Sequence, residues 1–419
     1  MAQPPLWICA LLTFSIVTAR ADEPAKPVRS EPSFIATLTD QTRVEGKLGA
    51  IQLDPSGTGT LTIVGEAPRT VSLLELVKVT QKEPVSTSVP PGAPLLVLPG
   101  RDHLLARIGA ADATSLEVAP LWAPDLSVRV PLDRPLGVIF NPPADRKVLS
   151  DLTQALRDPK RAGETLWLGN GDRKEGSFLG LDGERLQFDS GAGLVAIDRS
   201  TVTALGFDPA LAQYPDLQGP YLELLFADGS RLGASACRLD GPRLVFKTRF
   251  DAELAVPLSS LVSATVLNGS VSYLADRVPD AAQFVPYLDR HPMLYGHDQT
   301  WDGYPLRLGG ISYERGLGTL PRTLLAYRLE PTDRRFQALI GQDSRAGELG
   351  SLVFRVLVDR KEVYVSPPMS RRDTPIPIDL DVTGGRLLIL ITEFGERGDV
   401  QDSGDWADAR MIRGGSGSR

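Results

Sequence analysis

Histidine and cysteine are scarce in this chain of 419 residues. It contains three histidines, His103, His291 and His297, and two cysteines, Cys9 and Cys237. Because zinc enzymes, cysteine hydrolases and iron–sulfur proteins take their ligands or nucleophiles from these residue types, the composition argues against all three classes. A surplus of basic residues is also absent, since 45 Lys and Arg stand against 52 Asp and Glu, and the net charge is −7. Nucleic acid is therefore not an expected partner.

Long hydrophobic runs are absent beyond the first residues of the chain. Residues 6–18 are apolar, but a helix that spans a bilayer needs about 20 such residues. Ala19-Arg20-Ala21 follows this run and has the A-x-A pattern of a signal-peptide cleavage site. We therefore expect a signal peptide over residues 1–21, a disordered leader over residues 22–32, and a mature bacterial protein that is exported to the periplasm or secreted, without a transmembrane segment. Cleavage would leave Cys237 as the single cysteine, which we expect to be a small core residue.

Turn-forming residues, in contrast, are abundant. The 40 glycines and 34 prolines exceed their usual combined share of roughly 12%. So many helix-breaking residues leave little room for long helices. The hydrophobic fraction of 42% is sufficient for a packed core. The composition therefore predicts an all-β, turn-rich protein, and the length allows two or three domains at roughly 150 residues each.

A fourfold internal repeat occupies the region before residue 268. Each copy has a polar turn, a basic residue and a small residue three positions later, and it closes with Val, any residue, and then Leu or Ile. Asn-Gly and Asp-Gly turns favour hairpins, so we expect each copy to be a small β-meander or barrel-like unit. The basic residues either line a ligand strip or are solvated hairpin tips. The turns and their basic residues are 40–46 with Arg43, 100–106 with His103, 170–176 with Arg173, and 228–234 with Arg231.

A short helix is predicted between the second and third copies. Leu149, Leu152 and Leu156 recur at helical spacing and form one apolar face. A single unit of about 45 residues buries little area, so neighbouring units are expected to pack in pairs. The predicted organisation is two repeats over residues 33–140, a helical linker over residues 141–164, and two repeats over residues 165–268.

Longer strands are predicted from Val271 onward. Residues 352–358 place Leu, Phe and Val side chains on one face of a strand. Residues 387–391 are apolar on both faces, as in a central strand that is covered on both sides. Six or more strands without helical periodicity predict a β-sandwich.

Five ordered sequence blocks mark this C-terminal region. They are LRLGG at 306–310, YERGLGT at 313–319, FQALIGQD at 336–343, GSLVFRV at 350–356 and DSGDWADA at 402–409. Together with the lead-in VSYLAD at 271–276, they resemble the NPCBM family of carbohydrate-binding modules. The resemblance covers residues 271–413 and implies a galactose-binding-like jelly-roll sandwich. Residues 414–419 are then expected to be a disordered tail.

A sugar site needs an aromatic platform for the sugar ring and a few polar groups for its hydroxyls. Trp301 and Tyr304 share the polar loop 297–304, and Trp301 is the predicted exposed platform. Trp406 lies in the acidic loop near the end, where it either joins the site or anchors the last strand in the core. The predicted ligand-binding residues are Trp301, Tyr304, Asp343, Asp402, Asp405 and Trp406.

Acidic residues also raise the question of a metal ion. Asp399, Asp402, Asp405 and Asp408 recur every three residues around the last loop. Oxygen-rich clusters suit Ca²⁺, and this is the one metal that the sequence suggests. The alternative is that these carboxylates are simply solvated, and no other cofactor is predicted.

Two positions depart from the family pattern, because Leu320 and Ser403 stand where the family usually has histidines. The leading hypothesis is an exported, non-catalytic protein that binds glycans or glycoconjugates, with other envelope proteins as further partners. If the missing imidazoles serve the ligand, the module is instead a structural or protein-interaction domain that has lost sugar binding. A third alternative is a cryptic glycan-processing enzyme. The sequence has no G-x-S-x-G, H-E-x-x-H or Walker motif, so the chain is predicted not to be an enzyme.

Overall fold

The computed structural model describes residues 31–83, 85, 87–217, 219–286, 295–396, 398 and 400–414. The expected signal peptide, leader residues 22–30, Cys9, His291, Asp399 and tail residues 415–419 lie outside the described residues. Within the described part, the chain is nearly all β-strand with one α-helix, α1 (Arg146–Arg157), and the predicted all-β fold class is confirmed. No helix in that part is long and apolar enough to cross a membrane.

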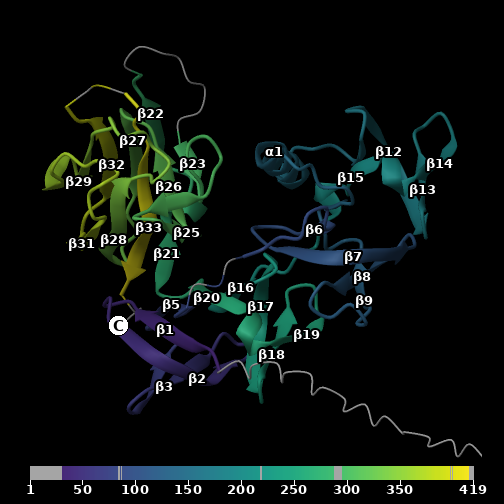
Figure 1. Cartoon of the computed structure of the whole chain (residues 1–419), viewed down its shortest axis with the longest axis horizontal. Coiled ribbons are helices and arrows are strands. Elements are labelled where there is room, and N and C mark those ends of the chain that lie inside the picture. The colour runs from purple at the N-terminus through teal and green to yellow at the C-terminus, as the bar shows by residue number, and fades with distance from the viewer. Residues whose placement is uncertain are drawn as a thin grey trace, which may run out of the picture. The chain divides into compact units, whose positions relative to one another are not determined.

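Four five-stranded units make up the region before residue 268 (Figure 1). In each unit the first four strands form an antiparallel meander, and the fifth strand returns to pair with the first. The first unit contains β1 (Ser33–Leu38), β2 (Arg43–Leu53), β3 (Gly59–Val64), β4 (Pro68–Ser72) and β5 (Leu76–Gln81); the second contains β6 (Leu95–Val97), β7 (His103–Ala111), β8 (Ser115–Pro120), β9 (Val128–Pro131) and β10 (Gly137–Ile139).

The third and fourth units repeat this order and add short 3₁₀ helices, two of which join the fourth strand to the fifth. The third unit contains β11 (Glu164–Leu168), β12 (Arg173–Asp182), β13 (Arg185–Asp189), β14 (Leu194–Asp198), η1 (Arg199–Thr201) and β15 (Val202–Gly206), and η2 (Pro209–Leu211) follows it; the fourth contains β16 (Tyr221–Phe226), β17 (Arg231–Asp240), β18 (Arg243–Thr248), β19 (Glu253–Pro257), η3 (Leu258–Ser260) and β20 (Leu261–Leu267).

The turns and the strand pattern explain why the repeated sequence folds in this way. Gly171 and Gly229 have φ values of 91° and 93°, the left-handed backbone that the first hairpin of the third and fourth units requires. Along β13 the burial alternates, so that Leu186 and Phe188 point into the core. The predicted meander is therefore present in each unit, with polar turns outside and period-two apolar residues inside.

Strand pairs between units do not follow sequence order. β5 pairs with β20 and β2 pairs with β17, which joins the first unit to the fourth. β10 pairs with β15 and β7 pairs with β12, which joins the second unit to the third. One further residue pair connects β7 to β17. The expected pairing within residues 33–140 and within residues 165–268 was therefore wrong.

Helix α1 shows the reason for this difference. The Asp145 side chain caps it by accepting from the backbone N–H groups of Lys147 and Val148, at 2.8 and 3.0 Å. Its buried residues Leu152 and Leu156 pack in one cluster with Val97 and Ile139 of the second unit and with Trp167 and Ala204 of the third. The linker thus joins the units on either side of it instead of separating two pairs.

The region from Val271 forms a sandwich of two antiparallel sheets and a separate hairpin, β24–β25. One sheet has the order β23-β26-β33-β28-β31, with β21 also on β33, and the other has the order β22-β27-β32-β29-β30, in which β32 is central as its apolar sequence predicts. The elements are β21 (Val271–Tyr273), η4 (Leu274–Asp276), β22 (Ala281–Phe284), β23 (Tyr295–His297), β24 (Leu306–Leu308), β25 (Ile311–Tyr313), β26 (Gly316–Thr319), β27 (Thr323–Arg328), β28 (Asp333–Gln342), β29 (Leu352–Val358), β30 (Lys361–Val365), β31 (Ile376–Asp381), β32 (Leu387–Phe394) and β33 (Gly404–Arg413).

Leu156 provides a test of how α1 joins its neighbours. Its side chain is fully buried, so Leu156→Ala should lower the free energy of unfolding by about 2–5 kcal/mol through the cavity it leaves. Val148 on the same helix is 52% exposed, and Val148→Ala should stay within about 0.5 kcal/mol of wild type. Urea unfolding of the full chain measures both variants. Equal effects of the two substitutions would contradict this packing.

Candidate functional site

Two aromatic side chains project from one tight turn of the sandwich. The backbone N–H of Thr300 donates to the Tyr304 carbonyl at 2.7 Å, and the Thr300 hydroxyl accepts from the Tyr304 N–H at 2.9 Å. This closure presents Trp301, which is partly exposed, and Tyr304, which is 39% exposed. The Arg345 guanidinium lies over the Tyr304 ring, 3.4 Å from its centroid, and also contacts the Asp302 carboxylate at 3.6 Å. We call residues 300–304 together with Arg345 the aromatic loop face.

Below this face, two carboxyl groups form a buried pair. Asp343 and Asp405 are 1% and 0% exposed, and both accept from the backbone N–H of Arg307, at 3.0 and 3.1 Å. Burial, and then the adjacent charge of Asp343 and its hydrogen bond, raise the pKa of Asp405 well above the ordinary carboxyl value. Asp405 therefore keeps its proton above the ordinary carboxyl pKa, and the pair fastens the strand that carries Arg307 to β33. Neither carboxyl group is placed to touch a ligand directly.

Trp406 is a core residue and not part of an exposed site. Its indole is fully buried, its Nε1 donates to the Thr392 hydroxyl at 3.0 Å, and its ring meets the edge of Phe354 at 5.1 Å. The sequence left two roles open for Trp406, a part of the binding site or an anchor in the core, and the structure shows the anchor. Asp402 is also buried, and its carboxylate accepts from the Ser351 N–H at 2.7 Å. The structure thus leaves Trp301 and Tyr304 as the predicted ligand-binding residues that solvent reaches.

The spaced aspartates point to different partners. The Asp408 carboxylate pairs with Lys78 of the first unit at 2.5 Å, whereas Asp405 pairs with Asp343. Asp399 lies outside the described residues. Among the residues that the structure describes, no group of three or more His, Cys, Asp or Glu is arranged to hold a metal ion. The spacing of three residues therefore does not gather Asp402, Asp405 and Asp408 into the Ca²⁺ cluster that it suggested.

Leu320 and Ser403 lie side by side. Thr319 of β26 is paired with Gly404 of β33, and the two residues follow and precede this pair directly. Leu320 is 9% exposed and Ser403 is partly exposed. The two histidines of the family pattern would therefore occupy adjacent positions on neighbouring strands. Their joint replacement removes both imidazoles from one place in the domain.

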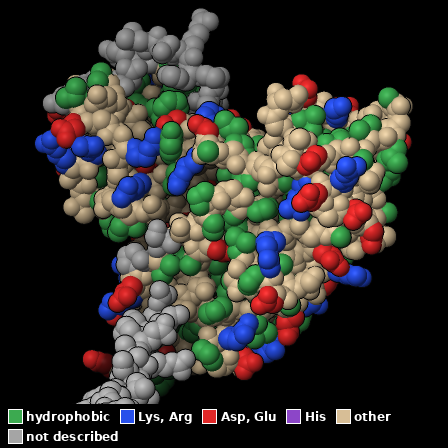
Figure 2. All heavy atoms as spheres, turned by 45° about the vertical axis from the view of Figure 1, so that its right-hand side comes forward, with side chains coloured by type: hydrophobic (Ala, Val, Ile, Leu, Met, Phe, Trp, Pro, Cys, Tyr) green, Lys and Arg blue, Asp and Glu red, His purple; other side chains and the backbone are tan. Residues whose placement is uncertain are grey.

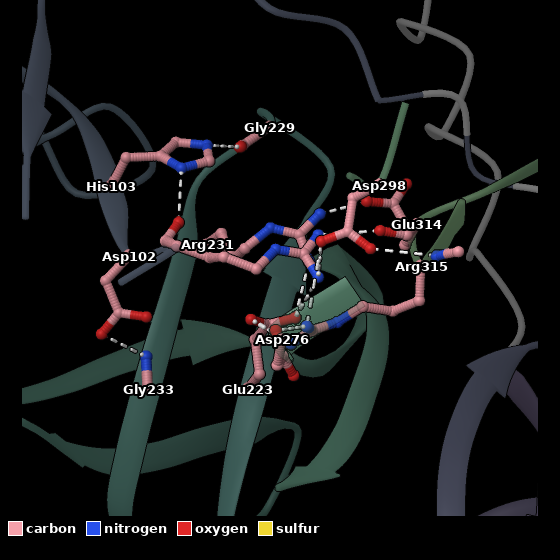
Figure 3. Close-up of polar contacts among 12 residues, drawn as sticks. Asp102, His103, Glu223, Gly229, Arg231, Gly233, Asp276, Asp298, Glu314 and Arg315 are labelled. Atoms are coloured by element: carbon pink, nitrogen blue, oxygen red, sulfur yellow. Dashed lines mark hydrogen bonds and ion pairs between the residues drawn. The ribbon is translucent and has the colours of Figure 1, made fainter. Parts of the chain in front are cut away.

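A cluster of buried charges joins the fourth unit to the sandwich, and the sequence did not reveal it (Figure 3). Glu223 of β16 is 3% exposed and accepts from Arg231 of β17 at 2.7 Å and from Arg315, next to β26, at 3.1 Å. Arg315 also binds Asp276 and approaches Asp298 at 3.9 Å. Burial alone would raise the pKa of Glu223, but the charges of the arginines hold it below the ordinary carboxyl value. The one sequence signal was a lone acid inside the apolar strand YLELLF.

Two further residues complete this charge cluster. Arg101 approaches Asp298 at 3.2 Å and Glu223 at 3.8 Å, and it donates to the Glu314 carbonyl at 2.8 Å. The Glu314 carboxylate in turn binds Arg231. The cluster therefore draws three arginines and four acids from the second unit, the fourth unit and the sandwich into one hydrogen-bonded group, which we call the junction cluster.

The basic turn residues of the repeats do not share one environment. His103 and Arg231 lie opposite each other in the β7–β17 pair, and the His103 ring nitrogens contact the carbonyls of Arg101 and Gly229 at 3.0 and 2.9 Å. Burial and nearby arginines lower the pKa of His103 to about 3, so its ring is neutral. Arg43 and Arg173 are exposed. The repeat motif therefore supplies solvated tips in the first and third units but interior contacts in the second and fourth.

Acidic and basic side chains both occur over the face shown in Figure 2.

The buried proton of Asp405 predicts a particular pH dependence. Since its folded pKa is raised, its contribution to stability is complete at acid pH and is lost as the pH rises through that value. Asp405→Asn keeps a neutral group that can donate to Asp343, so it should flatten the fall in melting temperature as the pH rises above the ordinary carboxyl pKa of 3.8. In the control Asp381→Asn, the lost group is exposed and has a pKa lowered by Thr383, so the fall should persist. An Asp405→Asn profile that matches wild type would contradict the raised pKa of Asp405.

The junction cluster predicts a large cost for removing its central acid. Glu223→Gln leaves Arg231 and Arg315 buried without their shared carboxylate, and the free energy of unfolding should fall by about 3–5 kcal/mol. The control is Glu362→Gln, which breaks a surface pair with Arg355 in which the two side chains are 44% and 37% exposed. Its effect should be below about 1 kcal/mol. Guanidinium unfolding of the full chain compares the two, and a small effect for Glu223→Gln would refute the burial of this charge.

Comparison with known proteins gives one family match, which lies in the C-terminal region, and several similar proteins. A family model, described as the NPCBM/NEW2 domain, matches residues 268–412. A 117-residue segment is 30% identical to a Renibacterium salmoninarum protein named "Putative endo-alpha-N-acetylgalactosaminidase", and it covers 28% of this chain and 8% of that protein. The chain therefore spans a small part of this relative's length.

Two solved structures are also similar. The CBM51 module of Clostridium perfringens GH95, in complex with methyl-galactose, is 24% identical, covers 34% of this chain and 99% of that chain, and has a TM-score of 0.31. The tandem CBM51 modules of Sp3GH98, a family 98 glycoside hydrolase from Streptococcus pneumoniae, are 12% identical, cover 64% of this chain and 91% of that chain, and have a TM-score of 0.32. The NPCBM/NEW2 family model thus matches residues 268–412, the region in which the sequence blocks predicted this resemblance.

Proposed function

We propose that this protein binds glycans through its NPCBM/NEW2 domain and that the aromatic loop face is the binding surface. The observation that carries the proposal is the pair of solvent-reachable aromatic residues, Trp301 and Tyr304, on one closed turn of this domain. Aromatic rings cover the apolar faces of sugar rings, while the polar groups of Asp302 and Arg345 beside them suit sugar hydroxyls. The buried pair Asp343 and Asp405 supports the face from below.

We further propose that the protein is exported and acts without catalysis. Catalysis of glycoside cleavage needs two carboxyl groups that reach the scissile bond. The close pair Asp343 and Asp405 is buried and already bonded to the Arg307 backbone, which argues against such a role. The four repeat units would then act as a scaffold that carries the glycan-binding domain. Export rests on the A-x-A pattern after the apolar run of residues 6–18.

One observation favours a second function. Leu320 and Ser403 lie together where the family pattern has two histidines. If those imidazoles contribute to sugar binding in the family, this domain recognises another protein, for example in the cell envelope, through the same loops. A glycan array probed with the full chain separates the two functions. Binding to no glycan at millimolar sugar, by a chain that remains folded, would favour the protein-interaction role.

Single substitutions on the aromatic loop face provide the sharper test. Trp301→Ala and Tyr304→Ala should each weaken binding to the best array glycan by about tenfold or more, because each removes a stacking surface. The melting temperature should change little, since both side chains reach solvent. Leu194→Ala, which removes a 64% exposed apolar residue of the third unit, is the matched control and should bind like wild type. Unchanged affinity in both aromatic variants would exclude this face.

A further inference from the structure

A cavity lies at the junction cluster, and no residue of the aromatic loop face lines it. It has a volume of about 330 Å³ and is lined by residues of the second unit, the fourth unit and the sandwich. This volume is at the lower end of the range for small-molecule sites, which often lie where parts of a protein meet. It exceeds what a simple inorganic anion needs and suits a ligand of about one sugar ring.

Basic groups outnumber acidic groups on the cavity wall. Five arginines and three carboxyl side chains line it. All three acids are already engaged by the protein: Glu223 and Asp276 bind Arg315, and Asp102 accepts from the Tyr214 hydroxyl at 2.5 Å and from a backbone N–H. Asp298 and Asp333 lie outside the wall and approach four of these arginines, so the arginine without a salt bridge among the described residues is Arg249.

Arg249 carries the clearest part of this surplus charge. Its Nε and Nη2 both donate to the Pro215 carbonyl, and its guanidinium lies over the rings of Tyr214 and Tyr221, at 4.4 and 5.4 Å from their centroids. Within the described residues, no carboxylate comes within salt-bridge distance of it. Stacking on two tyrosines and the Pro215 carbonyl hold the guanidinium plane in place, which leaves its Nη1 group to donate to a carboxylate.

Arg277 and Arg413 add to the positive charge of the cavity wall, because the two guanidinium groups share one carboxylate. Their nitrogens approach Asp333 at 3.7 and 3.8 Å, which is beyond hydrogen-bond length. In the part of the chain that the structure describes, Arg277 Nη1, Arg413 Nε, Arg315 Nε and the Tyr273 hydroxyl have no hydrogen-bond partner. Buried hydrogen-bond donors are nearly always satisfied. Several donors without a partner around one cavity therefore indicate a polar ligand.

We propose that this cavity binds a sugar residue that carries a carboxylate, such as a uronic acid. The carboxylate would pair with the guanidinium groups of Arg249, Arg277 and Arg413, and the ring hydroxyls would meet the remaining polar groups of the wall. This site is separate from the aromatic loop face and does not depend on glycan binding there. It adds recognition of acidic sugars to the proposed function.

Calorimetric titration of the full chain with D-glucuronic acid, with D-glucose and with acetate tests the proposal. Glucuronic acid should bind, whereas glucose and acetate should bind at least about tenfold more weakly, because each lacks one half of the recognised chemistry. No measurable binding of glucuronic acid at millimolar concentration would overturn the proposal. Equal affinity for glucose would overturn the role of the carboxylate, and equal affinity for acetate would overturn the role of the sugar ring.

Variants locate the binding. Arg249→Gln and Arg277→Gln should each weaken glucuronic acid binding by about tenfold, since a neutral amide cannot replace a charged donor. Arg372→Gln, at a side chain that is 73% exposed, is the control and should bind like wild type. Trp301→Ala should also leave glucuronic acid binding intact, so failure here is distinct from failure of the aromatic loop face. If Arg249→Gln unfolds, Arg277→Gln decides; wild-type affinity in a folded Arg277→Gln variant would overturn the assignment.

Discussion

A carboxylate that leaves water must find positive charge inside the protein, and Glu223 shows how much of this structure follows from that constraint. Its strand is otherwise apolar and buried, so the charge cannot turn to solvent. Arg231 comes from the next strand of the same unit, but Arg315 comes from the sandwich, 92 residues away. Satisfying one acid therefore requires the repeat region and the sandwich to meet at this point. Arg315 then draws in Asp276 and Asp298, and the junction cluster grows around it.

The sequence predicted local structure well, because local structure depends on neighbours in the chain. The positive-φ glycines of the hairpins, the alternating strands and the buried stripe of α1 all follow from spacing. The spacing does not reveal which units pair through their strands. All four units have similar edge strands, and any of these edges can pair with a similar strand. The pairing of β5 with β20 depends on contacts among residues that are almost 200 positions apart. Sequence order was the available guide, and it gave the wrong partners.

The same distinction applies to the candidate sites. Trp301 and Tyr304 stood out because aromatic residues are rare in polar loops. Asp343 and Asp405 stood out for their family blocks, but the sequence does not say whether a conspicuous acid is exposed or buried. The junction cluster was hidden because arginine and glutamate are common everywhere, and only their meeting in space gives them meaning. A lone glutamate in an apolar strand indicates a buried ion pair, because such a strand offers the carboxylate no path to solvent.

Stability alone does not account for the charges at the junction. Replacing a buried ion pair by well-packed apolar residues is often neutral or stabilising, so a hydrophobic contact would hold the same surfaces together at no greater cost. A cluster of charged groups also leaves donors that a close-packed apolar contact would not have, including the Tyr273 hydroxyl and Arg315 Nε. These unmet donors surround a cavity instead of a solid interface. A recognition role explains both features together, because a polar ligand needs the cavity and uses the donors that the protein leaves free.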